Sequence, residues 1–130
     1  SAAYPMANPL KILFVCGRNK RRSPTAEKMY AHDRRLAVRS VGLAETSKRR
    51  MVAADAQWAD LILVMERKYV GRIKTAFRQL DTLPPIVSLD IPDEYIFMQR
   101  ELIDLLGPAV ESAIENYRAE QAAAAAEDSA

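Results

Sequence analysis

The sequence predicts an α/β fold in which helices cover both faces of a parallel β-sheet. Two short, continuous apolar runs, at residues 11–16 and 60–65, are typical of buried parallel strands. Helical patterns follow both runs, and strands that alternate with helices favour a parallel sheet with right-handed crossovers. The chain has 130 residues, 49% of them hydrophobic, so we expect one compact domain with a substantial core.

Four strands and four helical regions are expected along the chain. The strands are short segments rich in apolar or β-branched residues: residues 11–16, 37–41, 60–65 and 85–89. The helical regions have apolar residues at helical spacing: residues 23–33, a short helix that ends near residue 58, residues 67–80, and a last region split at Gly107-Pro108. Ser23 and Pro24 are typical of a helix start, with serine as the cap and proline in the first turn.

A single domain is expected at residues 10–118, with flexible segments at residues 1–9 and 119–130. We expect the C-terminal segment to be frayed or disordered despite the helix propensity of its alanines. The first nine residues lack the pattern of a signal peptide, and no apolar run is long enough to span a bilayer. A lone cysteine does not indicate a secreted disulfide scaffold, so the expected compartment is the cytoplasm.

The net charge of +2 conceals an uneven distribution of charge along the chain. Residues 1–80 contain 17 Lys and Arg against 6 Asp and Glu, whereas residues 81–130 contain 2 against 11. Two interpretations are open: the basic part attracts an anionic ligand, or the two parts neutralise each other in the folded protein. Nucleic-acid binding has little support, because no aromatic residue is interleaved with the basic residues at 18–22.

The segment Cys16-Gly17-Arg18-Asn19-Lys20-Arg21-Arg22-Ser23-Pro24 carries the strongest indication of function. The only cysteine of the chain ends the first expected strand, and an arginine and a hydroxyl follow where a helix is expected to begin. A loop in this place presents backbone N–H groups and a helix N-terminus to an anion. Five residues separate Cys16 from Arg22, and Ser23 follows directly. This spacing indicates a phosphate-binding loop, or phosphate cradle, with a nucleophilic thiol beneath it.

The side chains of this segment match the demands of phosphomonoester hydrolysis. Cys16 is the expected nucleophile, since a helix N-terminus and nearby arginine favour the thiolate. Arg22 offers a planar fork for bidentate phosphate contact. The Ser23 hydroxyl can donate to the sulfur, and Asn19 can tie the loop together through bonds to the backbone and tolerates a left-handed conformation. The expected phosphate-binding residues are Gly17, Arg18, Asn19, Lys20, Arg21 and Arg22.

Structural interpretations of the same residues remain open. A buried cysteine at the end of a strand is often only a small hydrophobic residue. Arg18, Lys20 and Arg21 either contact a ligand or form a solvated run of charge.

The general acid is expected beyond another strand of the same sheet. Asp93 follows the fourth expected strand, and the carboxyl ends of parallel strands meet at one edge, where Cys16 also lies. Asp93 would protonate the leaving group and then take a proton from the water that hydrolyses the phosphocysteine. Asp90 is the rival acid, and a turn role after Pro92 is the structural alternative for Asp93. We expect no metal and no other cofactor, because the sequence has no cluster of metal-ligating residues.

Several segments resemble the low-molecular-weight protein tyrosine phosphatases. They correspond to the family's opening strand, phosphate loop and first helix, its Ser-Ala-Gly turn, its central strand and its acid loop: residues 11–16, 19, 22–27, 40–42, 59–65 and 92–95. The resemblance implies that Cys16 is the nucleophile, Arg22 the phosphate clamp, Ser23 the thiolate partner, Asn19 the loop brace and Asp93 the general acid. It also implies a three-layer fold with a four-stranded parallel sheet flanked by helices.

The chain departs from the family pattern at several points. Arg18 replaces a glycine of the loop, and Arg21 stands where many members have a second cysteine that can protect the first by a disulfide. Glu94 replaces the proline after the acid, whereas Pro92 precedes it. The stretch at residues 43–58 is shorter than in typical members, where it helps to wall the substrate cleft, so the substrate preference stays open.

The leading functional hypothesis is a cysteine-dependent phosphomonoesterase that acts on phosphotyrosine in proteins or on small aryl phosphates through a phosphocysteine. A deep cradle favours a long aryl ester over phosphoserine, because the phosphorus has to reach the sulfur. One alternative is a protein that binds phosphate or a phosphopeptide with weak or no catalysis. Another is an arsenate reductase, which would depend on an external thiol because Cys16 is the only cysteine. We expect neither nucleic acid nor membrane as a partner, and the sequence does not indicate the oligomeric state.

Overall fold

The structure is a computed structural model that describes residues 8–129. The elements, in chain order, are β1 (Leu10–Cys16), α1 (Arg22–Tyr30), β2 (Leu36–Gly42), α2 (Ala53–Trp58), β3 (Leu61–Val64), α3 (Lys68–Ala76), β4 (Ile86–Ser88) and α4 (Arg100–Ser129). All strands are parallel, and their order in the sheet is β2-β1-β3-β4. The predicted fold class and its four strands are therefore confirmed. Residues 1–7 of the expected N-terminal flexible segment lie outside the described residues.

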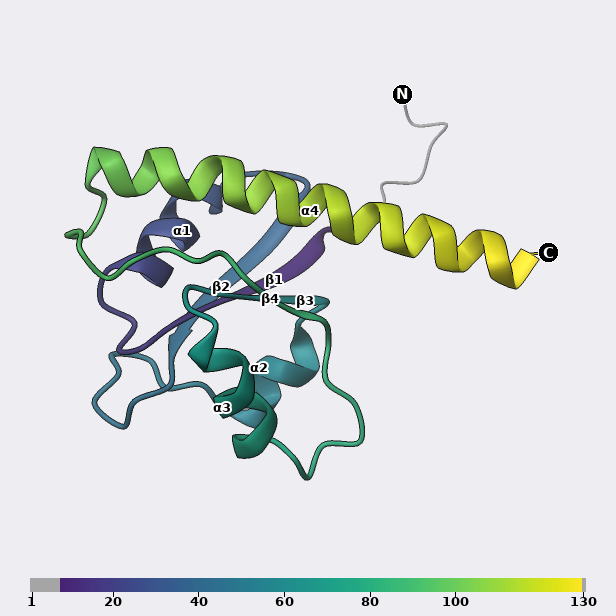
Figure 1. The fold of residues 1–130 in the computed structure, drawn as a ribbon, viewed down its shortest axis with the longest axis horizontal. Coiled ribbons are helices and arrows are strands. Elements are labelled where there is room, and N and C mark those ends of the chain that lie inside the picture. The colour runs from purple at the N-terminus through teal and green to yellow at the C-terminus, as the bar shows by residue number, and fades with distance from the viewer. Residues whose placement is uncertain (1–7, 130) are drawn as a thin grey trace.

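Helices cover both faces of the sheet (Figure 1). α1 and α4 lie on one face, and α2 and α3 lie on the other. Successive residues of a strand point to opposite faces, so Ile12 and Phe14 pack with α1 and α4, whereas Leu13 and Val15 pack with α2 and α3. All four side chains are fully buried, which explains why β1 is a continuous apolar run instead of an alternating one.

The last helix corrects two expectations from the sequence. α4 continues through Gly107-Pro108, although a proline removes one backbone hydrogen bond and was expected to split the helix. Leu106 and Val110, on either side of the proline, are fully buried and hold the helix against the sheet. α4 also continues to Ser129, where we expected a frayed or disordered tail from residue 119, and its end projects beyond the sheet (Figure 1). Extending an existing helix through alanines requires no new nucleation.

None of the described helices, α4 included, combines the length and the apolar character needed to cross a membrane.

Backbone hydrogen bonds hold the segment after β4 beside the end of β3. The N–H of Leu89 donates to the Val64 carbonyl, and the N–H of Ile91 donates to the Met65 carbonyl, both at 2.8 Å. The segment that contains Asp93 is thereby fixed at the edge of the sheet where β1 ends.

Candidate active site

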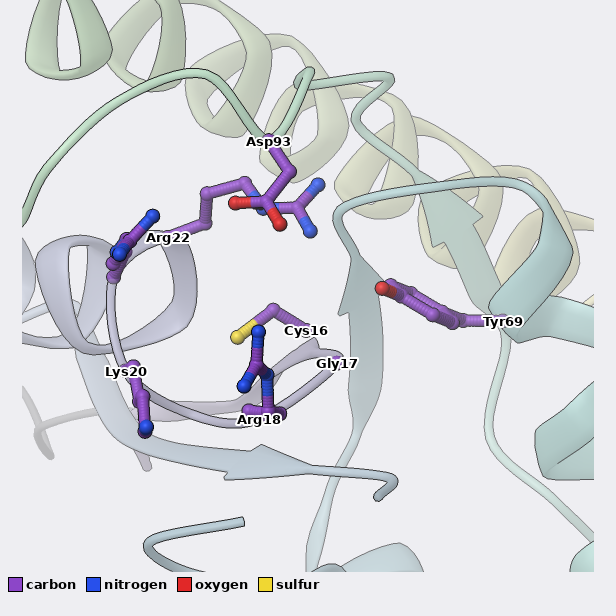
Figure 2. A pocket seen from close by; sticks show the side chains of 8 residues that line it. Cys16, Gly17, Arg18, Lys20, Arg22, Tyr69 and Asp93 are labelled. Atoms are coloured by element: carbon purple, nitrogen blue, oxygen red, sulfur yellow. Dashed lines mark ion pairs between the residues drawn. The ribbon is translucent and has the colours of Figure 1, made fainter. Parts of the chain in front are cut away.

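A cavity of about 200 Å³ opens at the carboxyl ends of the strands. Its lining comes from the end of β1, the loop that follows, the start of α1, α3 and the segment after β4: Cys16, Gly17, Arg18, Lys20, Arg21, Arg22, Tyr69 and Asp93. Figure 2 shows the Cys16 sulfur within the ring that the loop describes, with Asp93 across the cavity and the Tyr69 hydroxyl directed toward it. Ser23 and Asn19, the other expected site residues, lie behind the loop.

The loop between β1 and α1 turns carbonyl groups away from the cavity. The Gly17 carbonyl accepts hydrogen bonds from the N–H groups of Leu43 and Ala44, at 3.0 and 2.9 Å, and the Arg18 carbonyl accepts one from Lys48 at 3.1 Å. No backbone N–H of residues 17–21 donates to another residue in the described part of the chain. The N–H groups of the residues that line the cavity are left for a ligand, and such a cluster of amides is suited to bind an anion: Gly17, Arg18, Lys20 and Arg21. Asn19 does not line the cavity, and its backbone nitrogen lies against Gly42.

Asn19 and Ser23 brace the loop from behind. Asn19 has the left-handed φ of 54° that its residue type tolerates. Its Nδ2 donates to Ser23 Oγ at 3.0 Å and to Ser40 Oγ at 2.9 Å, so the brace runs through hydroxyl groups and not through the backbone bonds we expected. Ser23 Oγ lies 2.9 Å from Cys16 Sγ. Its proton can point to this sulfur or to the Val41 carbonyl at 3.3 Å, and a thiolate draws it to the sulfur.

Ser23 is not the cap of α1, which corrects the sequence-based expectation. The helix begins at Arg22, and Arg21 occupies the cap position without a side-chain hydrogen bond to the helix. The Ser23 hydroxyl is instead engaged with Cys16 behind the loop. Pro24 lies in the first turn, where its missing N–H leaves no intrahelical bond unmade.

The Arg22 guanidinium is held on several sides. Arg22 is buried, and its Nη1 donates to the Ile91 carbonyl at 2.7 Å while Nη2 donates to Glu66 Oε2 at 2.9 Å. Its Nε lies 3.7 Å from Asp93 Oδ1. Burial disfavours the charge, but the hydrogen bond to Glu66 and the negative charges of Asp93 and Glu66 raise the pKa of Arg22 above its ordinary value. A cation is therefore fixed in the wall of the cavity that Cys16 also lines.

Glu66 and Tyr69, which follow β3, are site residues that the sequence analysis did not identify. Burial works against the Glu66 carboxylate, but the donors of Tyr69 and Arg22 lower the pKa of Glu66 below its ordinary value. Tyr69 is buried and so close to Gly17 that a Cβ there would lie 2.9 Å from Tyr69 Oη. Burial and the Glu66 carboxylate raise the pKa of Tyr69 to about 12. The one available signal was their place after a buried strand, at the edge where ligands bind.

Asp93 lines the cavity, and Asp90 does not. The Asp90 carboxylate forms an exposed ion pair with Arg67 at 3.2 Å. The segment around Asp93 is anchored to α1, since the N–H of Met98 donates to Thr25 Oγ1 at 3.0 Å. The Asp93 side chain is 56% exposed, so it is accessible to an arriving substrate.

Arg18, Lys20 and Arg21 form a positively charged rim around the cavity. All three are exposed, and within residues 8–129 none lies in ion-pair distance of a carboxylate. Their position fits the interpretation as ligand contacts.

Comparison with solved structures identifies the fold. No protein-family model matches the sequence, and no curated protein matches it. Similar structures include the YwlE arginine phosphatase from Geobacillus stearothermophilus, with 22% identity over 87% of this chain and 96% of that one and a TM-score of 0.63. The tyrosine phosphatase Wzb from Escherichia coli K30 in complex with phosphate has 20% identity over 82% of this chain and 96% of that one, with a TM-score of 0.63. YfkJ from Bacillus subtilis has 16% identity over 89% of this chain and 99% of that one, also with a TM-score of 0.63.

The chain therefore has the fold of the low-molecular-weight protein tyrosine phosphatases, as its resemblance to that family predicted.

Proposed function

We propose that this protein is a cysteine-dependent phosphomonoesterase that acts on phosphotyrosine in proteins or on small aryl phosphates. One observation carries the proposal: Cys16 Sγ lies 2.9 Å from Ser23 Oγ, beneath a loop whose N–H groups have no acceptor among the described residues. A phosphoryl group bound by these amides and by Arg22 would present its phosphorus to the sulfur. The fold shared with solved phosphatases supports the proposal.

The first half-reaction transfers the phosphoryl group to sulfur. The Cys16 thiolate attacks phosphorus, an S–P bond forms, and the P–O bond to the leaving group breaks. Arg22 and the loop amides bind the non-bridging oxygens and stabilise the negative charge of the transition state. The substrate dianion competes with Asp93 for Arg22, a pair now 3.7 Å apart, and Asp93 as a carboxylic acid donates its proton to the leaving oxygen.

The second half-reaction restores the thiolate. The Asp93 carboxylate takes a proton from water, the water oxygen attacks phosphorus, and the S–P bond breaks to release inorganic phosphate. The Ser23 hydroxyl donates a hydrogen bond to the departing sulfur and stabilises its negative charge. The thiol has to stay reduced between turnovers, which supports the cytoplasm as the compartment.

The burial of the sulfur favours an aryl leaving group. Cys16 is 3% exposed, so a substrate needs a long side chain to bring its phosphorus to the cavity floor while the polypeptide stays at the rim. Phosphoarginine is the competing substrate class, because the YwlE arginine phosphatase has the same fold. The cations Arg18 and Arg21 on the rim repel a guanidinium leaving group and favour a phenol.

Hydrolysis of p-nitrophenyl phosphate and of a phosphotyrosine peptide tests the proposal. We expect Cys16→Ser to lose on the order of 10⁴-fold or more in kcat. Peptides of the same sequence with phosphoserine or phosphoarginine should be poor substrates of the intact protein. Equal rates for the intact protein and Cys16→Ser contradict the proposal. Tight binding of inorganic phosphate without hydrolysis of either substrate would instead assign the cradle to a binding protein.

A further inference from the structure

A second, larger hollow adjoins the candidate active site and takes no part in the chemistry described above. This groove has a volume of about 850 Å³ and runs over α1, β2 and residues 48–49. Lys20 lines both the groove and the reaction cavity, so the two hollows meet at this residue. A polypeptide whose phosphorylated side chain enters the cavity can therefore lie along the groove.

Positive charge dominates the walls of the groove. Lys20, Lys28 and Lys48 are exposed, and no carboxylate of residues 8–129 lies within ion-pair distance of any of them. Arg49, the fourth cation, pairs with a carboxylate of α2 at 3.2 Å. Glu27, the one acidic residue that the described part of the chain contributes to the lining, accepts a hydrogen bond from a serine hydroxyl at 2.8 Å. The groove thus has at least three cations available to an acidic ligand.

The groove also has an apolar side. Phe97 is 45% exposed there, and the Nζ of Lys28 lies 5.6 Å from the centroid of its ring. Val38 and Pro24 extend the apolar surface. An exposed ring beside lysines suits a ligand that carries both acidic and apolar side chains.

The lysines of the groove are held in a fixed relation to the phosphate cradle. The backbone N–H of Lys48 donates to the Arg18 carbonyl at 3.1 Å, and Lys28 lies on α1, the helix that begins with Arg22. The fold therefore sets the separation between the backbone positions of these lysines and the phosphate cradle.

We propose that the groove binds acidic residues that flank the phosphorylated residue of a protein substrate. This inference rests on the proposed phosphatase function and adds a substrate class to it, namely acidic phosphopeptides. A polypeptide fits the groove better than a nucleic acid strand. Single-stranded nucleic acids are bound through stacking of successive bases on aromatic side chains, whereas Phe97 is the one aromatic residue among the described residues that line the groove.

Steady-state kinetics with matched phosphotyrosine peptides test this proposal. One peptide carries glutamate on both sides of the phosphotyrosine, and the other carries glutamine at the same positions. We expect the intact protein to prefer the acidic peptide by about tenfold in kcat/KM, through KM, and to lose this preference as salt rises. The double variant Lys28→Gln, Lys48→Gln should lose most of the preference. Lys74→Gln on α3, an exposed lysine across the sheet, is the matched control and should keep it.

p-Nitrophenyl phosphate separates this proposal from the phosphatase function, because it is too short to reach the groove. If it is not hydrolysed, the phosphatase proposal fails, and binding of the two phosphopeptides to Cys16→Ser then tests the groove by itself. Equal kcat/KM values for both peptides at low salt, or an unchanged preference in the double variant, overturn the groove proposal. It is also overturned if a 5′-phosphorylated oligonucleotide binds more tightly than the acidic peptide and depends on the same two lysines.

Discussion

Single residues of the site depend on partners that are distant in sequence. Glu66 holds one nitrogen of Arg22 at 2.9 Å and supplies a negative charge that the buried guanidinium needs. Glu66→Gln keeps the shape and one acceptor oxygen but removes that charge. We expect kcat/KM for p-nitrophenyl phosphate to fall roughly 10- to 100-fold, because Arg22 is no longer held in one orientation. Glu115→Gln, on the exposed face of α4, is the control, and equal values for both variants would show that Glu66 does not position Arg22.

Glu66 also makes stability depend on pH. Burial alone would raise its pKa, but the donors of Tyr69 and Arg22 lower it below the ordinary value of 4.5. A carboxyl group whose pKa is lower in the folded state contributes stability above its unfolded pKa and loses it as pH falls through the folded pKa. The gap in free energy of unfolding between the intact protein and Glu66→Gln should therefore be complete near neutral pH and shrink below pH 4.5. Urea unfolding of both proteins at several pH values measures this difference in free energy. A difference that grows as pH falls would contradict the lowered pKa of Glu66.

The dependence of the rate on the leaving group shows whether Asp93 or Asp90 is the general acid. Asp93→Asn should lose on the order of 10²-fold in kcat for phenyl phosphate, whose leaving group needs a proton, and less for p-nitrophenyl phosphate, whose leaving group does not. Asp90→Asn is the matched control, since Asp90 has a φ of 55° and asparagine tolerates this conformation. A larger, leaving-group-dependent loss in the Asp90 variant would reverse the assignment.

The sequence alone was enough to predict that Cys16 and Arg22 line one cavity, because a short loop joins them. Asp93 could be placed there as well, because parallel topology brings the ends of the strands together. The same topology places Glu66 and Tyr69, which follow β3, at that edge, but their contacts with Arg22 and Gly17 leave no local pattern that would have identified them as site residues. The cap at Ser23 was predicted wrongly because its hydroxyl has partners outside the helix.

Among the elements, β2 and the segment that follows it pack behind the loop between β1 and α1 and support it. A Cβ at Gly42 would clash with Ser47 Oγ and lie 2.8 Å from the Asn19 backbone nitrogen. Gly42→Ala should therefore cost about 1–3 kcal/mol of stability and lower kcat by displacing the loop. Gly71→Ala, inside α3 with nothing within 4 Å of its Cβ, is the control and should stabilise the fold by up to about 1 kcal/mol. Equal unfolding energies for the two variants would contradict this packing.

The exposed C-terminal end of α4 and its buried earlier part contribute differently to the stability of the fold. Residues 119–129 are exposed throughout, whereas Leu106 is fully buried. We expect a chain that ends at Arg118 to keep its thermal midpoint and its kcat, and Leu106→Ala to lose about 2–5 kcal/mol of stability. Differential scanning calorimetry compares them. A large loss on truncation would mean that the projecting turns have a stabilising partner.

The elements themselves were largely predictable from hydrophobic patterning. β1 and β3 are continuous apolar runs because both of their faces are buried, and this signal is local. The continuity of α4 through Pro108 was not predictable, because it depends on contacts of Leu106 and Val110 with the rest of the core. The helix-breaking tendency of Pro108 can be read from the local sequence, whereas the packing that keeps the helix intact depends on distant residues.

In the whole molecule, the basic and acidic parts of the chain neutralise each other in part, as one interpretation of the uneven charge predicted. Ion pairs join the basic and acidic parts of the chain, such as Arg35 with Glu111 at 3.0 Å and Arg67 with Asp90 at 3.2 Å. The rim of the cavity and the adjoining groove are not neutralised in this way within the described residues, so positive charge is concentrated where a phosphorylated substrate would arrive.

Intact-protein mass spectrometry after rapid acid quench tests the central chemistry most directly. Asp93→Asn is the protein to use, with p-nitrophenyl phosphate, because phosphoryl transfer to sulfur then proceeds while hydrolysis of the intermediate is slowed. We expect an increase by the mass of one phosphoryl group, located on the peptide that contains Cys16 and absent when Cys16 is replaced by serine. Hydrolysis that continues in Cys16→Ser, with no phosphorylated Cys16 at any quench time, would show that this thiol is not the nucleophile.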